Sequence, residues 1–183
     1  MAFFEAFVNQ GFQPIDFLTF LARQHILFET IHPFDDGNGR TGRIILNYLL
    51  ISVGYPPVIL KGDDENKTRY CKALEQGDYV LRELTQKQFS HQDVQQALGN
   101  MNTSFLADFL SESLRVSFDR LLVQLLEEQE GIKLKPAKEV GKALDYSPDS
   151  IRTLISRGKF IAVKSGKEWL THEKLLLKQN RSD

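Results

Sequence analysis

Residues 32–43 read HPFDDGNGRTGR, and this stretch decides how the rest of the chain is interpreted. Gly37 and Gly39 allow positive φ angles, so the backbone here can approach a ligand closely. They precede a predicted helix, whose first N–H groups and dipole favour an anion. Arg40 and Arg43 are three positions apart on that helix, so both guanidinium groups lie on one face. The stretch therefore predicts an anion-binding loop whose two arginines reach phosphates.

A candidate base and a candidate metal ligand accompany this loop. His32 stands at the end of the preceding predicted helix, and histidine suits a general base at neutral pH. Asp36 offers a hard oxygen ligand suited to Mg²⁺ carried on phosphates. Together these groups outline a site for phosphoryl or nucleotidyl transfer. The alternative is an ordinary Asp-Asp-Gly-Asn-Gly turn beside a histidine whose hydrogen bonds are satisfied locally. The spaced arginines make this alternative less favoured.

The composition is that of a globular chain. Its 183 residues are 42% hydrophobic and 26% charged, so a core forms without disulfides or a structural metal. No apolar run approaches the ~20 residues of a membrane helix. The single cysteine, Cys71, cannot form an internal disulfide, which fits a reducing cytoplasm. The four histidines are scattered, and no Cys/His cluster suggests zinc.

The charge is distributed unevenly along the chain. Residues 1–132 hold 11 Lys/Arg and 18 Asp/Glu, a formal charge of −7. Residues 133–183 hold 12 and 6, a formal charge of +6. This reversal predicts two units with different partners, with domains at 1–131 and 132–183. The basic unit either faces nucleic acid or docks on the acidic one.

Apolar periodicity predicts a mainly α fold for the first domain. Asp16 is expected to cap the first helix and Thr103 or Ser104 the last, and His25 is interpreted as a helix histidine that packs or caps. No strand is expected before Phe160. The apolar start at Phe3, Phe4 and Phe7 leads us to expect a chain that begins inside a domain. The predicted helices cover residues 16–31, 40–54, 64–76, 89–98 and 104–130.

The basic C-terminal domain has its own pattern. A short helix is predicted over 136–144, and Ser147 is expected to cap a second one that has Pro148 at its first position and ends at Gly158. Strands over 160–164 and 167–170 are predicted to form a hairpin around Ser165-Gly166. Thr171 is expected to cap a final helix through about Lys178. The second helix is expected to bury Ile151, Leu154 and Ile155.

This order of helix, turn, helix and wing resembles the winged helix-turn-helix domains of the excisionase and MerR type. The resemblance implies DNA binding, although such domains also mediate protein contacts. Asp149 stands where a phosphate would approach the second helix, which argues against tight binding. The residues expected to reach DNA are Arg152, Thr153, Arg157, Lys164 and Lys167.

The segment at 32–43 resembles the signature of the Fic family, HxFx(D/E)GNGRxxR, and every defined position matches. The resemblance covers roughly residues 3–126, including Phe28-Glu29-Thr30-Ile31 and Tyr55-Pro56-Pro57-Val58. It implies a helical core and transfer of AMP from ATP to a Ser, Thr or Tyr hydroxyl of a target protein. The cofactor implied is Mg²⁺, with ATP as co-substrate.

The resemblance also implies roles for individual residues. His32 would take the proton from the attacking hydroxyl, and Asp36 would hold Mg²⁺ on the α- and β-phosphates. The anion pocket would consist of Gly37, Asn38 and Gly39, with Asn38 near the α-phosphate. The outer phosphates would contact Arg40 and Arg43. Phe34 is interpreted as a core residue whose ring anchors the loop.

Two features of the Fic family have no match in this chain. Its β-hairpin flap lies ahead of the motif, where residues 1–16 are too short and too helical to supply one. Its inhibitory motif, (S/T)xxxE(G/N), fails at Glu130-Gly131, where Leu126 stands in place of Ser or Thr. The expectation is therefore a fragment that lacks the N-terminal part, or an uninhibited protein.

The leading hypothesis is a cytoplasmic protein adenylyltransferase with a C-terminal winged helix. One alternative is another Fic reaction, either phosphate transfer or AMP removal. A second is a DNA-binding regulator whose Fic part senses a nucleotide. The target and the oligomeric state stay open.

Overall fold

A computed structural model of the chain describes residues 17–60, 64–85 and 88–177. The chain divides into two compact units, Met1–Leu114 and Arg115–Asp183. The described residues are mainly helical and include one small antiparallel sheet, in the second unit. This confirms the predicted mainly α class with a C-terminal hairpin. The domain boundaries at 131 and 132 and the winged-helix assignment stay predictions.

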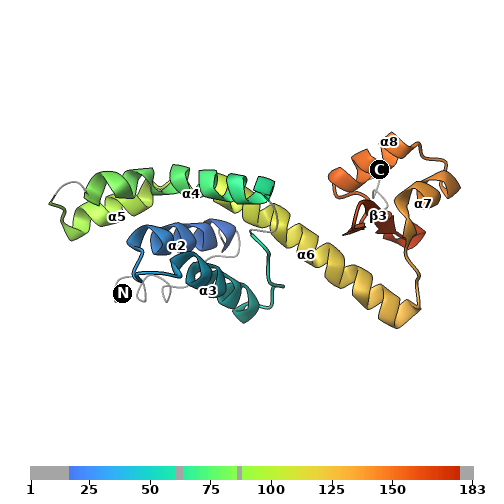
Figure 1. The fold of residues 1–183 in the computed structure, drawn as a ribbon, viewed down its shortest axis with the longest axis horizontal. Coiled ribbons are helices and arrows are strands. Elements are labelled where there is room, and N and C mark those ends of the chain that lie inside the picture. Colours follow the sequence, from blue (N-terminus) through green and yellow to red (C-terminus); the bar gives the residue numbers. More distant parts are fainter. Residues whose placement is uncertain (1–16, 61–63, 86–87, 178–183) are drawn as a thin grey trace, which may run out of the picture. The chain divides into compact units, whose positions relative to one another are not determined.

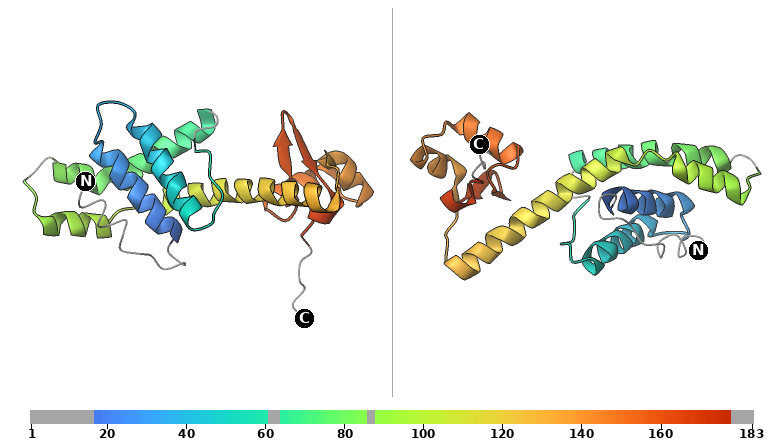
Figure 2. Two further views of the ribbon diagram at one scale, coloured as in Figure 1. Left: turned by 90° about the horizontal axis from the view of Figure 1, so that it is seen from below. Right: turned by 180° about the vertical axis from the view of Figure 1, so that it is seen from behind.

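The first unit is built from helices that pack in pairs. The loop that carries the HPFDDGNGRTGR motif joins α2 (Phe17–Ile31) to α3 (Asn38–Ser52), and the two helices lie side by side in both figures (Figures 1 and 2). The others are α4 (Asp64–Thr85), α5 (His91–Gly99) and the start of α6 (Ser104–Glu130). The core includes the fully buried side chains of Ala22, Ile26, Leu50, Leu106 and Leu110.

The predicted helices are present, but α4 extends beyond the expected end at residue 76 to Thr85. Gly77 lies inside it, where a Cβ would stand 3.0 Å from Ile26 Cγ1. The glycine therefore lets α2 approach α4 closely instead of ending the helix, and Leu81 is buried one turn later. The expected cap at Asp16 and the apolar start at residues 3–7 lie outside the described residues.

The second unit contains the end of α6, then β1 (Lys135–Pro136), α7 (Ala137–Ala143), α8 (Pro148–Ser156), β2 (Val163–Ser165) and β3 (Glu168–Thr171). The strand order is β1-β3-β2, and both pairs are antiparallel. Figure 2 shows the β2–β3 hairpin beside the two short helices. Its core includes Val123 of α6, Ile151 and Ile155 of α8, Phe160 and Leu175.

Several local predictions in this unit are confirmed. The N–H of Ser150 donates to Ser147 Oγ at 3.1 Å, and Pro148 is the first residue of α8. Gly158 follows the helix with φ of 66°. Gly166, with φ of 58°, lies in the hairpin turn, because the register pairs Ser165 with Glu168.

The expectation of no strand before residue 160 is wrong, because β1 pairs with β3. β1 has two residues, which is too short to produce an alternating pattern in the sequence. Pro136 lies opposite Leu170 on this edge strand, where a missing N–H is tolerated.

The predicted cap at Thr171 is also wrong. Thr171 is fully buried in β3, and its hydroxyl donates to the carbonyl of Ile161 at 2.6 Å. A single 3₁₀ turn, Glu173–Leu175, follows instead, and its cap is His172, whose Nδ1 accepts from the N–H of Lys174. Leu176 then bridges to Phe160 in extended conformation, so no final helix forms up to Leu177; Lys178 lies outside the described residues.

Among the described residues, none of the helices combines the length and hydrophobicity that a membrane crossing requires.

We predict that Thr171→Val lowers the free energy of unfolding of the second unit by about 1–3 kcal/mol, because the buried carbonyl of Ile161 loses its donor. Trp169 is the only tryptophan of the chain, so its fluorescence in a urea titration monitors this unit. Thr171→Ser keeps the hydroxyl and serves as the control. A valine variant that is as stable as the serine variant would contradict the role of this bond.

Candidate active site

The loop between α2 and α3 is closed by the side chain of Asn38. This side chain is 2% exposed, and its Oδ1 accepts from the N–H of Phe34 at 2.9 Å. Its Nδ2 donates to the carbonyl of the same residue at 2.5 Å. Both polar ends of a buried amide are thus satisfied within the loop, which fixes the start of α3 close to the end of α2.

The predicted core role of Phe34 is wrong. Its side chain is 46% exposed, although its ring centroid lies 6.4 Å from that of Phe28. The loop does not depend on burying this ring, because the Asn38 amide holds the Phe34 backbone instead.

His32 ends α2 in an unusual conformation. Its φ is 49°, in the left-handed region that few non-glycine residues adopt, and its N–H donates to the carbonyl of Phe28. Its Nδ1 lies 3.2 Å from the carbonyl oxygen of Glu29. Since a carbonyl only accepts, Nδ1 carries the proton in this contact, and Nε2 of the neutral ring has the free lone pair. The exposed imidazole is therefore oriented by its Nδ1 contact, which leaves Nε2 without a part in it.

The N-terminus of α3 has no side-chain cap. Gly37 occupies the N-cap position with φ of 83°, and the first turn contains no acidic residue. By contrast, α5 and α8 are capped by Ser90 and Ser147. The first amide groups of α3 thus remain available to an anion.

The two arginines of the motif have different surroundings. Arg40 is 73% exposed, and its Nη2 lies 3.1 Å from Oδ2 of Asp36, which is 93% exposed. Arg43 is half-buried, and its Nη1 is buried without a hydrogen-bond acceptor among the described residues. Arg43 Nη1 and the Glu29 carboxylate both flank Gly39, at 3.3 and 3.8 Å from the position of a Cβ there.

A buried polar cluster lies beneath the motif. His25 Nε2 is 2.6 Å from the hydroxyl of Tyr70, which also donates to Glu29 Oε1 at 3.4 Å. Burial and the Glu29 carboxylate raise the pKa of Tyr70 far above its ordinary value, while the charge and hydrogen bonding of Arg43 act in the opposite direction. The expectation of a helix histidine that packs is confirmed, since the side chain of His25 is 3% exposed.

Gly42 allows this cluster to form. A Cβ at this position would lie 2.5 Å from Glu29 Oε1 and 3.2 Å from His25 Cε1. A larger residue would therefore push the Glu29 carboxylate out of this position. Sequence analysis gave no role to Gly42, Glu29 or Tyr70, and only Gly42, a glycine inside a predicted helix, carried a local signal.

The candidate DNA contacts of the second unit are all exposed, as expected for a binding surface. One of them has an acidic partner, however: Arg152 Nη1 lies 3.7 Å from Oδ1 of Asp149. Lys167 is followed in the sequence by Glu168. The hydroxyl of Thr153 donates to the carbonyl of Asp149 within α8. The other exposed candidates are Arg157 and Lys164.

The geometry defines a class of site, a helix N-terminus without a side-chain cap whose loop carries an imidazole and two arginines. Residues 1–50 match the family described as Fic/DOC. The resemblance seen in the motif is thereby confirmed for this segment of the chain.

The names of similar proteins agree with this family match. A probable protein adenylyltransferase of Aquifex aeolicus is 32% identical over 155 residues, which are 79% of this chain and 44% of the relative. The protein adenylyltransferase Fic of Aedes aegypti is 39% identical over 83 residues, 43% of this chain and 16% of the relative. That of Drosophila yakuba is 44% identical over 62 residues, 33% and 12% of the two chains. The chain thus spans less than half the length of these relatives. No solved structure matches it.

We predict that Tyr70→Phe lowers the free energy of unfolding by about 1–3 kcal/mol, because buried His25 loses its hydrogen bond to the tyrosine hydroxyl. Tyr48→Phe removes the hydroxyl of a tyrosine that is 69% exposed on α3, and it should change stability little. Chemical denaturation of both variants, followed by far-ultraviolet circular dichroism, compares them. Equal stability of the two variants would show that the buried cluster contributes nothing.

Proposed function

We propose that residues 32–43 form the catalytic loop of a protein adenylyltransferase, which moves AMP from ATP to a Ser, Thr or Tyr hydroxyl of a target protein. The observation that carries the proposal is an oriented His32 at one end of the loop whose other end is the uncapped start of α3. The names of the relatives from Aquifex aeolicus and Aedes aegypti support it.

In this proposal His32 is the general base. Its Nε2 accepts the proton of the target hydroxyl as the hydroxyl oxygen bonds to the α-phosphorus of ATP. The bond between the α-phosphorus and the bridging oxygen to the β-phosphate breaks, and pyrophosphate leaves. The Nδ1 contact with the Glu29 carbonyl keeps the ring in the required tautomer and orientation.

The phosphates are bound by backbone and guanidinium groups. Because the Asn38 side chain is used within the loop, the contribution of Gly37, Asn38 and Gly39 comes from the backbone at the start of α3. Arg40 and Arg43 neutralise the charge of the outer phosphates. Such positioning and charge neutralisation supply most of the catalysis of phosphoryl transfer.

The residues present fit a magnesium ion that arrives with the nucleotide. Mg²⁺ prefers oxygen ligands and usually binds to one or two carboxylates plus substrate phosphates. Asp36 offers an exposed carboxylate, and the described residues contain no group of three or more His, Cys, Asp or Glu that would form a protein-only metal site. Asp36 would therefore hold the ion. When bound, the ion would offset the negative charge of the phosphates.

The resemblance of the second unit to winged helices supports DNA binding as a second function. The favourable observation is that Arg152, Thr153, Arg157, Lys164 and Lys167 are all exposed. The nearby carboxylates of Asp149 and Glu168 reduce the attraction for phosphates. We place the protein in the cytoplasm because its single cysteine has no partner within the chain.

We predict that His32→Ala lowers AMP transfer at least about 100-fold while nucleotide binding persists, because an alcohol attacks slowly until a base accepts its proton. The full-length protein is incubated with ATP labelled at the α-phosphate and a cell lysate. His91→Ala, an exposed histidine of α5, is the control and should retain activity. Undiminished labelling by His32→Ala would refute the base assignment.

We also predict that Arg43→Ala weakens ATP binding more than AMP binding, because its guanidinium should contact an outer phosphate that AMP lacks. A charge-assisted contact is worth about 1.5–3 kcal/mol, or about 10- to 100-fold in affinity. Calorimetry with both nucleotides measures the difference, and Arg120→Ala, an exposed residue of the other unit, is the control. Equal losses for ATP and AMP would give Arg43 a structural role instead.

A further inference from the structure

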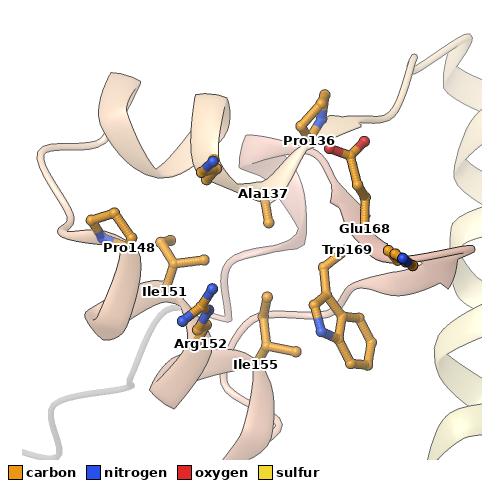
Figure 3. Close-up of a pocket in the computed structure, with 10 residues that line it drawn as sticks. Pro136, Ala137, Pro148, Ile151, Arg152, Ile155, Glu168 and Trp169 are labelled. Atoms are coloured by element: carbon orange, nitrogen blue, oxygen red, sulfur yellow. The ribbon is translucent and has the colours of Figure 1, made fainter.

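We propose that the C-terminal unit binds an acidic segment of a partner protein, which inserts one apolar side chain into a pocket between α7, α8 and β3 (Figure 3). The pocket has a volume of about 180 Å³. Pockets that enclose whole small molecules are larger, at ~300–1,000 Å³. The size of this pocket suits a single leucine-like or aromatic side chain.

The floor of the pocket is apolar. Figure 3 shows Ala137, Ile151, Ile155 and Trp169 around one space, with the indole beside Ile155. Ile151 and Ile155 belong to the core and are 2% and 6% exposed, whereas Trp169 is 39% exposed. Tryptophan is enriched among the residues that dominate protein–protein binding, and here its ring forms one wall of a recess.

The indole is restrained by its neighbour across the hairpin. Lys164 on β2 pairs with Trp169 on β3, and its Nζ lies 6.0 Å from the centre of the ring. A cation at this distance from an aromatic face is attracted to it. The wall of the pocket is therefore partly ordered before a partner arrives, which lowers the entropic cost of binding.

The rim of the pocket is mainly basic. Lys138 of α7, Arg152 of α8 and Lys167 of the hairpin turn all line it, and Glu168 is the one acidic lining residue among the described ones. Residues 133–183 carry a formal charge of +6, so the field around the pocket has the same sign. Carboxylates that flank an apolar side chain would find cations from α7, α8 and the hairpin turn at the rim.

A protein segment fits this surface better than duplex DNA does. A duplex would bring its phosphates to the basic rim, where Glu168 repels a phosphate and a peptide carboxylate alike. Its phosphates would also leave the apolar floor and the Trp169 ring unfilled. A peptide that combines an apolar side chain with a few carboxylates satisfies both the floor and the rim.

Because Trp169 is the only tryptophan of the chain, its fluorescence reports on occupancy of the pocket. The probes are four peptides of the form acetyl-Asp-Glu-X-Glu-Asp-amide, in which X is leucine, isoleucine, methionine or phenylalanine. They are titrated into the full chain while Trp169 emission is recorded. We expect a saturable change with at least one of them, and affinity at least about tenfold weaker when X is serine, because the serine peptide fills no apolar space.

A charge-reversal pair tests the rim. Arg152→Glu combined with Lys167→Glu changes two exposed residues that line the pocket, and we expect at least about tenfold weaker binding. Lys142→Glu combined with Arg157→Glu reverses two charges at exposed positions outside the pocket lining, so this pair is the matched control and should cost less than about threefold. Circular dichroism verifies that both variants fold.

Each contrary result overturns the proposal. If none of the four peptides changes the emission in a saturable way at millimolar concentration, the pocket is not a peptide site. If the serine peptide binds equally well, the apolar anchor is wrong. If the control pair at residues 142 and 157 costs as much as the pocket pair, only net charge matters. Binding of duplex DNA that the pair abolishes, without peptide binding, would assign this face to DNA.

Discussion

The candidate active site depends on the reciprocal hydrogen bonds between the Asn38 amide and the backbone of Phe34. The loop contains two glycines and an exposed phenylalanine ring, so apolar burial alone leaves its backbone many conformations. A buried amide with both ends satisfied removes that freedom at little desolvation cost. With the loop closed, Gly37 starts α3 in the left-handed conformation, and His32 ends α2 in the same region. The His32 imidazole and the first amides of α3 thereby lie at the two ends of the same loop.

A second constraint fixes how the helices beneath the loop are rotated. Buried polar groups need hydrogen-bond partners. Here the hydroxyl of Tyr70 on α4 bonds to both His25 and Glu29 on α2. The absence of a side chain at Gly42 leaves room for the Glu29 carboxylate against α3. Negative charge is thus placed close to Arg43, the motif residue whose Nη1 is buried. Arg43 is therefore half-buried near a carboxylate, whereas Arg40 pairs with Asp36 on the exposed surface.

The parts of the structure that sequence could predict are those whose cause is local. The Ser147 side chain caps α8 by a hydrogen bond, and the fixed φ angle of Pro148 suits the first helical position. The motif loop is likewise defined by residues that are close together in the sequence. The role of Tyr70 in the buried cluster was not predicted, because its partner His25 lies 45 positions away in the sequence. Thr171 was misassigned for a similar reason: threonine ahead of an acidic residue is typical of a helix cap, but here the distant carbonyl of Ile161 takes its hydroxyl. Tertiary hydrogen bonds therefore decide what local propensity leaves open.

Under the two proposals, the chemistry and the choice of target belong to different parts of the chain. His32, Asp36, Arg40 and Arg43 are all assigned to the phosphates, the metal or the proton, so the loop itself contributes little to recognising a protein. A pocket that accepts one apolar side chain among carboxylates would retain a partner and raise its effective concentration. Because only one side chain is buried there, binding would be weak enough for the partner to dissociate after modification. The C-terminal pocket would then supply target selectivity without slowing product release.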